Sequence, residues 1–263
     1  MKIITIFLFT CITLFGRVYY AKVEPYEFRN ISSNVSGLVV YADESLIGKK
    51  LGKKPYIVID DELDSKEIRF IDKKVKYLHK ILEVNEKTLA NLLSSLQKKR
   101  DNYEKVVGLK FKSAVEKDKE YYDLIATENM TLSTQKEIEN LKIQITDLKL
   151  RKIQLQRSIK DKHLKADGFV LYDLMVRAGQ VVGISTPLAK VADVSKAKLT
   201  IYLDDEDVLD AKNKVVYIDA KKTDYKISRI LNIADSKNIS KYMAQIIIKS
   251  PKLFSKLVKV ELK

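Results

Sequence analysis

The sequence has few of the residues that interrupt regular structure. Its 263 residues include eight glycines, four prolines, one cysteine and no tryptophan. Between Asp61 and Asp167 there is one glycine, Gly108, and no proline, whereas six of the eight glycines lie in the two segments that flank this stretch. Because glycine and proline punctuate secondary structure, this distribution predicts a long helical insertion between β-rich segments.

Side-chain patterns typical of catalytic or metal sites are also scarce. His79 and His163 are separated by 84 positions and fit no metal-ligand spacing. The acidic run 204–207 lacks the glycine and the final glutamate of a calcium loop, and we interpret it as a solvated turn. We therefore expect that the chain is not an enzyme and has no catalytic residue, metal site or cofactor.

The lone cysteine lies in an apolar N-terminal segment. Lys2 precedes an apolar run from Ile3 to Phe15, and thirteen residues are fewer than the roughly 20 that a spanning helix needs. Residues 1–21 are therefore predicted to be a secretory signal with cleavage after Ala21, or an uncleaved N-terminal anchor, because Tyr19 occupies a position that favours a small residue. The context of Cys11 gives only weak support for lipidation. An exported chain cleaved here would have no disulfide.

The net charge of +14 suggests an anionic partner. Basic residues alternate with acidic ones along the whole chain, and no arginine-rich stripe or basic arm emerges. We do not expect nucleic-acid binding. Attraction to anionic membrane headgroups is compatible with this charge.

Two segments 131 positions apart carry the same pattern. Each has a glycine followed by an apolar strand that ends in tyrosine, then two glycines spaced eleven and four residues on, and finally a proline, a short strand and an aspartate. This repetition predicts two matching half-sheets that fold face to face, with glycines at tight turns where φ is positive. The glycines are Gly37, Gly48, Gly52, Gly168, Gly179 and Gly183.

Heptads fill the segment between the two copies. On the ascending arm ten of twelve seam positions are apolar or aromatic, and Asn85 and Lys99 are the exceptions. A period of 3.5 residues predicts a left-handed coiled coil. The seam positions are 68, 71, 75, 78, 82, 85, 89, 92, 96, 99, 103 and 106.

The descending arm has a less regular pattern. Its apolar positions place a phase slip between Leu132 and Ile138, where the step is six residues rather than seven. At the turn, Gly108 can end the first arm, and Ser113 with Glu116 forms a capping box. The predicted seam is Phe111, Val115, Tyr122, Ile125, Leu132, Ile138, Leu141, Ile145, Leu148, Leu155 and Ile159.

After Val194 the pattern becomes one of short strands. Candidates are 199–203, 215–218, 225–231, 242–248 and 257–262, with a short acidic helix or turn at 204–211. Five strands at this spacing predict a small antiparallel barrel, with which the segment 26–31 could pair.

Taken together, these features resemble the periplasmic adaptor family, also called membrane fusion proteins or HlyD-like secretion proteins. The resemblance covers residues 26–262 and is most specific over 165–211, which includes Ala166-Asp167-Gly168-Phe169-Val170, Val191-Ala192-Asp193 and Leu199-Thr200-Ile201-Tyr202-Leu203-Asp204-Asp205-Glu206-Asp207-Val208. It implies an α+β multidomain fold with a split lipoyl-like (barrel-sandwich hybrid) module, a long antiparallel helical hairpin and a small antiparallel β-barrel. The hairpin occupies the place where lipoyl domains present their modified lysine, so a cofactor is not implied.

The resemblance also implies domain bounds. These are residues 1–21 for the signal or anchor, 22–34 for an N-terminal strand segment, 35–60 and 166–195 for the two lipoyl halves, 61–165 for the hairpin with its tip at about 107–113, and 196–263 for the barrel. The family often has a further membrane-proximal domain built from both termini, and we expect it to be absent or minimal here.

Family members that dock onto a TolC-type channel carry an arginine, a leucine four residues on and a serine seven further. Aligning that serine with Ser113 places Val106 at the leucine and Asn102 at the arginine, so Asn102 departs from the pattern. Tyr103 and Gly108 also resemble family residues. These five residues are the predicted docking tip.

The function implied is that of a periplasmic adaptor associated with the inner membrane. Its partners would be an inner-membrane transporter of the ABC or RND type, an outer-membrane TolC-like channel and further copies of itself in a hexameric ring. An alternative is a periplasmic coiled-coil tethering protein that contacts no channel.

Overall fold

The computed structural model describes residues 17–234 and 241–263. Most of the predicted signal or anchor, including Cys11, lies outside the described residues. The chain divides into two compact units. The first, here called the β unit, combines the N-terminal residues up to Ser33 with Val39–Ile57 and Lys165–Lys263, and the second, the hairpin unit, contains Asn34–Leu38 and Val58–Leu164.

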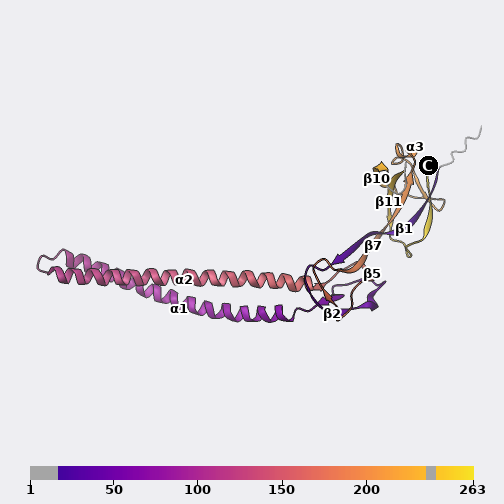
Figure 1. The fold of residues 1–263 in the computed structure, drawn as a ribbon. Helices are drawn as coiled ribbons and strands as arrows, with labels where there is room; N and C mark the ends of the chain where they lie inside the picture. The colour runs from indigo at the N-terminus through magenta and orange to yellow at the C-terminus, as the bar shows by residue number, and fades with distance from the viewer. Residues whose placement is uncertain (1–16, 235–240) are drawn as a thin grey trace, which may run out of the picture. The chain divides into compact units, whose positions relative to one another are not determined.

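Strands make up most of the β unit, as Figure 1 shows. The elements of the whole chain in order are β1 (Val18–Ser32), β2 (Gly37–Ala42), a 3-10 turn (Glu44–Leu46), β3 (Ile57–Ile59), α1 (Glu62–Val107), α2 (Ala114–Lys162), β4 (His163–Leu164), β5 (Val170–Leu174), β6 (Val181–Val182), β7 (Pro187–Leu203), α3 (Asp205–Val208), β8 (Val216–Ile218), β9 (Lys221–Lys222), β10 (Ile227–Ala234), β11 (Tyr242–Lys249) and β12 (Leu257–Leu262).

The strands of the larger sheet are hydrogen-bonded in the order β10-β11-β7-β1-β12-β8-β9, and β5 also pairs with β7. The alternating apolar residues of these strands point inward, and the buried cluster that they form includes Leu199, Ile201, Val216, Ile246 and Val260. The five strands predicted after Val194 all have counterparts here. Burial of one face of each strand explains the alternation in the sequence.

β1 is longer than the sequence predicted, and its pairing differs from the prediction. Val18–Lys22 pairs with β12, Val23–Pro25 pairs with the second half of β7, and Glu27–Ser32 pairs with the first half of β7. The contact with the barrel strands therefore comes from residues 18–25 and not from the predicted segment 26–31. The reason is that the fifteen-residue β1 follows the seventeen-residue β7 antiparallel along most of its length.

The two copies of the repeat are hydrogen-bonded to each other within the β unit. The N–H of Gly48 donates to the carbonyl of Leu171 at 2.8 Å, and the N–H of Gly179 donates to the carbonyl of Val39 at 2.8 Å. Gly48, Gly168 and Gly179 have φ of 79°, 87° and 90°. The predicted positive φ is thus wrong for Gly37, Gly52 and Gly183. At Gly37 a Cβ would lie 2.7 Å from a methyl group of Ile59, so close packing explains that glycine.

In the hairpin unit α1 and α2 run side by side (Figure 1). With 46 and 49 residues they are each about 70 Å long, at 1.5 Å per residue. All twelve predicted seam positions of α1 are buried or half-buried, which confirms the ascending heptad. Leu78, Leu141 and Ile145 form a buried cluster in the seam, with Val75, Leu82 and Leu148 packed around it.

The predicted phase slip on α2 is wrong. The buried and half-buried positions toward the tip continue in regular steps of three and four from Ile138 back to Lys117. Apart from Leu124, the seam there consists of polar residues, three of them threonines, so the apolar pattern in the sequence predicted the wrong seam positions. The positions of this series are Lys117, Glu120, Leu124, Thr127, Thr131 and Thr134, and Ile125 and Glu128 are half-buried beside it.

Candidate docking surfaces of the helical hairpin

The turn that joins the two helices is fixed by a capping box. Ser113 precedes α2, and its hydroxyl accepts a hydrogen bond from the N–H of Glu116, while the Glu116 carboxylate accepts from the N–H of Ser113 at 3.0 Å. Lys112 pairs with the same carboxylate at 2.9 Å. Hydrogen bonds from Lys112 and then from Ser113 lower the pKa of Glu116 to about 2. The predicted cap is confirmed, and the Ser113 side chain is committed to it.

The five residues of the predicted docking tip do not form one cluster. Asn102, Gly108 and Ser113 are exposed, whereas Tyr103 and Val106 are half-buried at seam positions of α1. The ring of Tyr103 lies 5.7 Å from that of Tyr121. Gly108 ends α1 with φ of −72°, so it stays in the right-handed helical region and does not form a left-handed C-cap.

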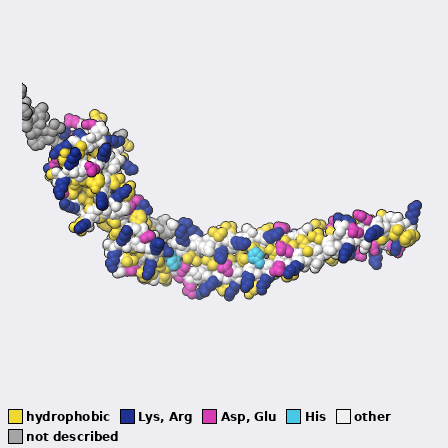
Figure 2. Space-filling view, turned by 180° about the vertical axis from the view of Figure 1, so that it is seen from behind, with side chains coloured by type: hydrophobic (Ala, Val, Ile, Leu, Met, Phe, Trp, Pro, Cys, Tyr) yellow, Lys and Arg dark blue, Asp and Glu magenta, His cyan; other side chains and the backbone are white. Residues whose placement is uncertain are grey.

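Sequence reasoning missed the apolar surface of the tip. Phe111 and Val115, which were assigned to the seam, have exposed fractions of 79% and 78%. Tyr122 lies two helical turns after Val115, and Leu132 lies nearly three turns further along α2; both are also exposed. We call Phe111, Val115, Tyr122 and Leu132 the tip stripe. Hydrophobic side chains are visible at the tip in Figure 2.

The tip stripe arises from an exchange of polarity between the two sides of α2. In a coiled coil the seam is apolar and the outer side is polar. Here the seam holds Lys117, Glu120 and the threonines with Leu124 as its one apolar residue, whereas Val115 and Tyr122 are exposed on the outer side. Exposed apolar side chains grouped at one end of an element are candidates for an interaction site. Extending the heptad backwards along the sequence from Ile138, whatever the polarity of each residue, would have revealed the tip stripe.

A second apolar stripe lies on α1, toward the open end of the hairpin where α1 begins and α2 ends. Its members are exposed and recur at intervals of seven residues, with one addition. They occupy one side of α1 because seven residues are two helical turns. We call this set the α1 stripe: Leu63, Phe70, Tyr77, Ile81 and Val84.

At the same level α2 carries three exposed apolar residues, Ile143, Leu150 and Ile153, which we call the α2 stripe. The ion pair between Glu67 and Arg151, with a nitrogen–oxygen distance of 2.7 Å, marks one side of the seam. Counted in heptads from the seam, the α1 stripe lies on the side of this ion pair, Ile143 and Leu150 lie on the side of α2 that points away from α1, and Ile153 lies toward the side opposite the ion pair. The hairpin thus has apolar surface on two different sides.

The described residues offer no metal-binding cluster and no membrane-spanning helix. No group of three or more potential metal ligands occurs in the part of the chain that the structure describes. Within 17–234 and 241–263 no helix has the length and hydropathy of a membrane span. The predicted solvated turn at 204–207 needs correction, because Asp207 is buried and paired with Arg17 and Lys214.

A split, hydrogen-bonded repeat, a long hairpin inserted into it and a small barrel after it make up the fold of the membrane fusion proteins. MacA from Actinobacillus actinomycetemcomitans is similar with a TM-score of 0.69 at 17% identity, over 94% of this chain and 78% of that one. A putative efflux transporter from Bacteroides eggerthii has a TM-score of 0.58 at 14% identity, over 94% and 68% of the two chains.

The membrane fusion protein Spr0693 from Streptococcus pneumoniae has a TM-score of 0.54 at 11% identity, over 94% of this chain and 99% of that one. No family model and no curated protein matches the sequence. The structural similarity confirms the predicted fold class, including the helical hairpin and the β modules.

Proposed function

We propose that this chain is the non-enzymatic adaptor subunit of an export system in the periplasm, where it links an inner-membrane transporter of the ABC or RND type to an outer-membrane TolC-type channel. The fold is that of the membrane fusion proteins, one of which, MacA, is similar over nearly the whole chain. The single observation that carries the proposal is the exposed apolar tip stripe. A hairpin about 70 Å long with such a tip is suited to reach a distant partner and to bind it.

The docking site comprises the tip stripe together with the exposed residues of the predicted tip. Phe111 and Val115 flank the capped turn and supply apolar contact area. Asn102, Gly108 and Ser113 are exposed at the same end of the hairpin, while Tyr103 and Val106 are half-buried at seam positions. Apolar anchors bordered by polar residues are the usual composition of a binding surface. Ser113 acts through the cap, which fixes the turn that presents Phe111.

Further copies of the chain are the second partner. The α1 stripe and the α2 stripe lie at the same level on different sides of one hairpin, so the α1 stripe of one copy can pack against the α2 stripe of the next. A contact between two different surfaces repeats from copy to copy and closes into a ring when the rotation permits. We propose a hexamer, associated with the inner membrane.

Photocrosslinking in cells tests the channel docking. A photoreactive phenylalanine analogue at position 111 is expected to capture the outer-membrane channel, identified by mass spectrometry, because Phe111 is the most protruding apolar residue of the turn. The same analogue at exposed Lys149, on α2 but far from the tip, is the matched control. Capture of other copies alone, together with unchanged drug or metal susceptibility after deletion of the hairpin, would instead support the tethering protein.

A further inference from the structure

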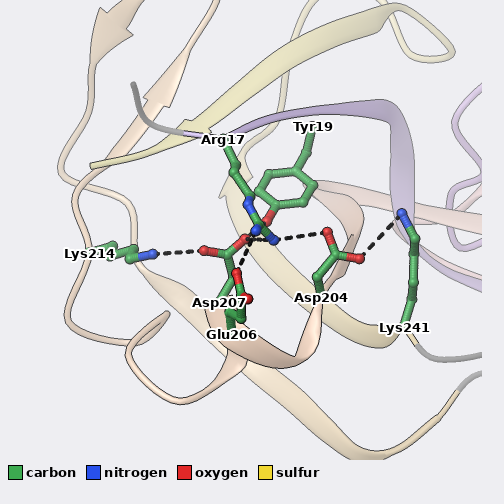
Figure 3. Close-up of polar contacts among 7 residues, drawn as sticks. All are labelled: Arg17, Tyr19, Asp204, Glu206, Asp207, Lys214 and Lys241. Carbon is green, nitrogen blue, oxygen red and sulfur yellow. Dashed lines mark hydrogen bonds and ion pairs between the residues drawn. The ribbon is translucent and has the colours of Figure 1, made fainter. Parts of the chain in front are cut away.

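The first described residues of the chain are integral to the β unit. Ala21 is 1% exposed within the buried cluster, and Val18–Lys22 pairs with β12. Figure 3 shows that Arg17 and Tyr19 also reach the α3 turn. A chain that began at Lys22 would lose the strand pairing, the buried alanine and these contacts.

The contacts at α3 converge on Asp207. The guanidinium of Arg17 lies 3.1 Å from the carboxylates of both Asp207 and Asp204, and 2.6 Å from that of Glu206. The Tyr19 hydroxyl donates a hydrogen bond to Asp207, and Lys214 pairs with the other carboxylate oxygen at 3.0 Å. β1 is thereby held in place from its first residue. The apolar run from Ile3 to Phe15 ends three positions before this strand.

The outward face of β1, β12, β8 and β9 combines apolar and basic side chains. Strand residues alternate between the two faces of a sheet, so the strand register shows which residues of neighbouring strands lie side by side on the outward face. Tyr20 lies opposite Lys259, and Lys22 lies opposite Leu257. Tyr20 and Leu257 have exposed fractions of 68% and 62%. On the neighbouring strands Glu261 lies opposite Tyr217, and Tyr217 lies opposite Lys222.

Positive charge dominates this face. Glu261 is the carboxylate in its centre, and it is already paired with Lys259 and Lys263 at 2.8 Å each. The Lys263 ammonium also lies 4.7 Å from the centroid of the Tyr217 ring. Glu24, the next outward residue along β1, lies opposite Lys198 of β7. We call the set Val18, Tyr20, Lys22, Leu257, Lys259, Lys263, Tyr217 and Lys222 the basic face.

We propose that the basic face binds the headgroups of an anionic lipid bilayer. Exposed lysines attract anionic lipids, and tyrosine rings favour the interface between headgroups and acyl chains. The continuity of the chain decides between a membrane and other anionic partners, because β1 contributes Tyr20 and Lys22 only a few residues after an apolar run. With the run attached, the strand that follows it carries the lipid-binding side chains Tyr20 and Lys22.

The absence of tryptophan from the sequence allows a direct test with single-tryptophan probes. Full-length Tyr20→Trp and Leu257→Trp proteins are reconstituted into phosphatidylcholine vesicles with or without phosphatidylglycerol, and quenching by brominated lipids is measured. The apolar N-terminal run is present in every sample, so any difference reports on the basic face. Tyr172→Trp is the matched control, since Tyr172 is 56% exposed and lies 5.2 Å from the Lys190 ammonium.

We expect a blue shift and strong quenching of both probes in vesicles that contain phosphatidylglycerol, and little quenching of Tyr172→Trp. Adding Lys22→Glu and Lys222→Glu should lower the equilibrium constant for binding of the basic face to the phosphatidylglycerol vesicles by at least about 30-fold. Lys98→Glu with Lys105→Glu changes the net charge equally on the hairpin and should have no effect. Three outcomes would overturn the proposal: quenching that does not depend on lipid charge, equal quenching of Tyr172→Trp, or no quenching of either probe. None of these outcomes bears on channel docking.

Discussion

Three glycines of the β unit adopt a backbone conformation that residues with a side chain rarely adopt. At Gly168 and Gly179 φ is 87° and 90°, and a Cβ would meet no atom within 4 Å. The glycines are therefore required by the backbone and not by lack of space. A β-branched residue in this region costs roughly 2 kcal/mol.

Gly179→Val is accordingly expected to lower the free energy of unfolding of the β unit by about 2 kcal/mol. Differential scanning calorimetry should show the melting temperature of this unit reduced by about 4–8 °C. Gly52→Val provides the control, since Gly52 has neither a positive φ nor a neighbour within 4 Å of the added Cβ. Equal losses in the two variants would refute the backbone argument.

Asp207 makes the stability of the barrel depend on pH. Burial by itself would raise its pKa, but hydrogen bonds from Tyr19 and Lys214, with the charge of Arg17, lower the pKa below its ordinary value. A folded-state pKa below the unfolded one stabilises the protein above the unfolded pKa of about 4, and the stabilisation is lost as the pH falls. Lys259 and Lys263 similarly lower the pKa of Glu261 to about 2.

We therefore expect the melting temperature of the β unit to fall as the pH decreases from about 5 to 2.5. Asp207→Asn should destabilise the protein at pH 7 by about 2 kcal/mol, because it weakens charged hydrogen bonds. It should also flatten the dependence on pH over the same range. An Asn variant with the slope of the unchanged protein would show that Asp207 does not carry the effect.

At the scale of elements, the two helices differ in how well their sequences predict their packing. The α1 seam could be predicted at all twelve positions because its residues are mostly apolar. On α2 the seam toward the tip contains Thr127, Thr131 and Thr134, each of which donates its hydroxyl hydrogen to the carbonyl four residues earlier. This local bond lets threonine occupy a seam, so hydrophobicity alone could not locate it.

The threonine seam should limit the stability of the hairpin toward its tip. Replacing Thr127 and Thr131 with valine keeps the shape and adds buried apolar surface, so we expect about 1 kcal/mol of stabilisation for each exchange. Hydrogen exchange of the backbone amides in this half of α1 and α2 should slow accordingly. Thr146→Val is the control, because Thr146 is exposed and makes the same backbone bond. Equal slowing in the control would show that helix propensity, and not the seam, is responsible.

At the scale of the whole molecule, the fold class could be predicted because the repeat and the heptads are local patterns that the sequence displays directly. The site was predicted less well. The partners of Asp207 lie up to 190 positions away in the sequence, and the outward position of Phe111 depends on which side of α2 meets α1. Such long-range pairings have no local signature, so only the folded chain reveals them.

The proposed ring makes a directional prediction about contacts between copies. Tyr77 and Ile143 lie at the same level on different sides of the hairpin, so in the proposed ring a cysteine at each position should meet its counterpart in the neighbouring copy. With Cys11 replaced by serine, oxidation of the Tyr77→Cys, Ile143→Cys protein in membranes should give a ladder of crosslinked species that ends at six copies. Tyr77→Cys with Asp147→Cys is the control, since heptad position puts both on the side of the Glu67–Arg151 pair. A dimer as the largest product would indicate a symmetric pair and exclude the ring, whereas a ladder without an upper limit would indicate an open filament.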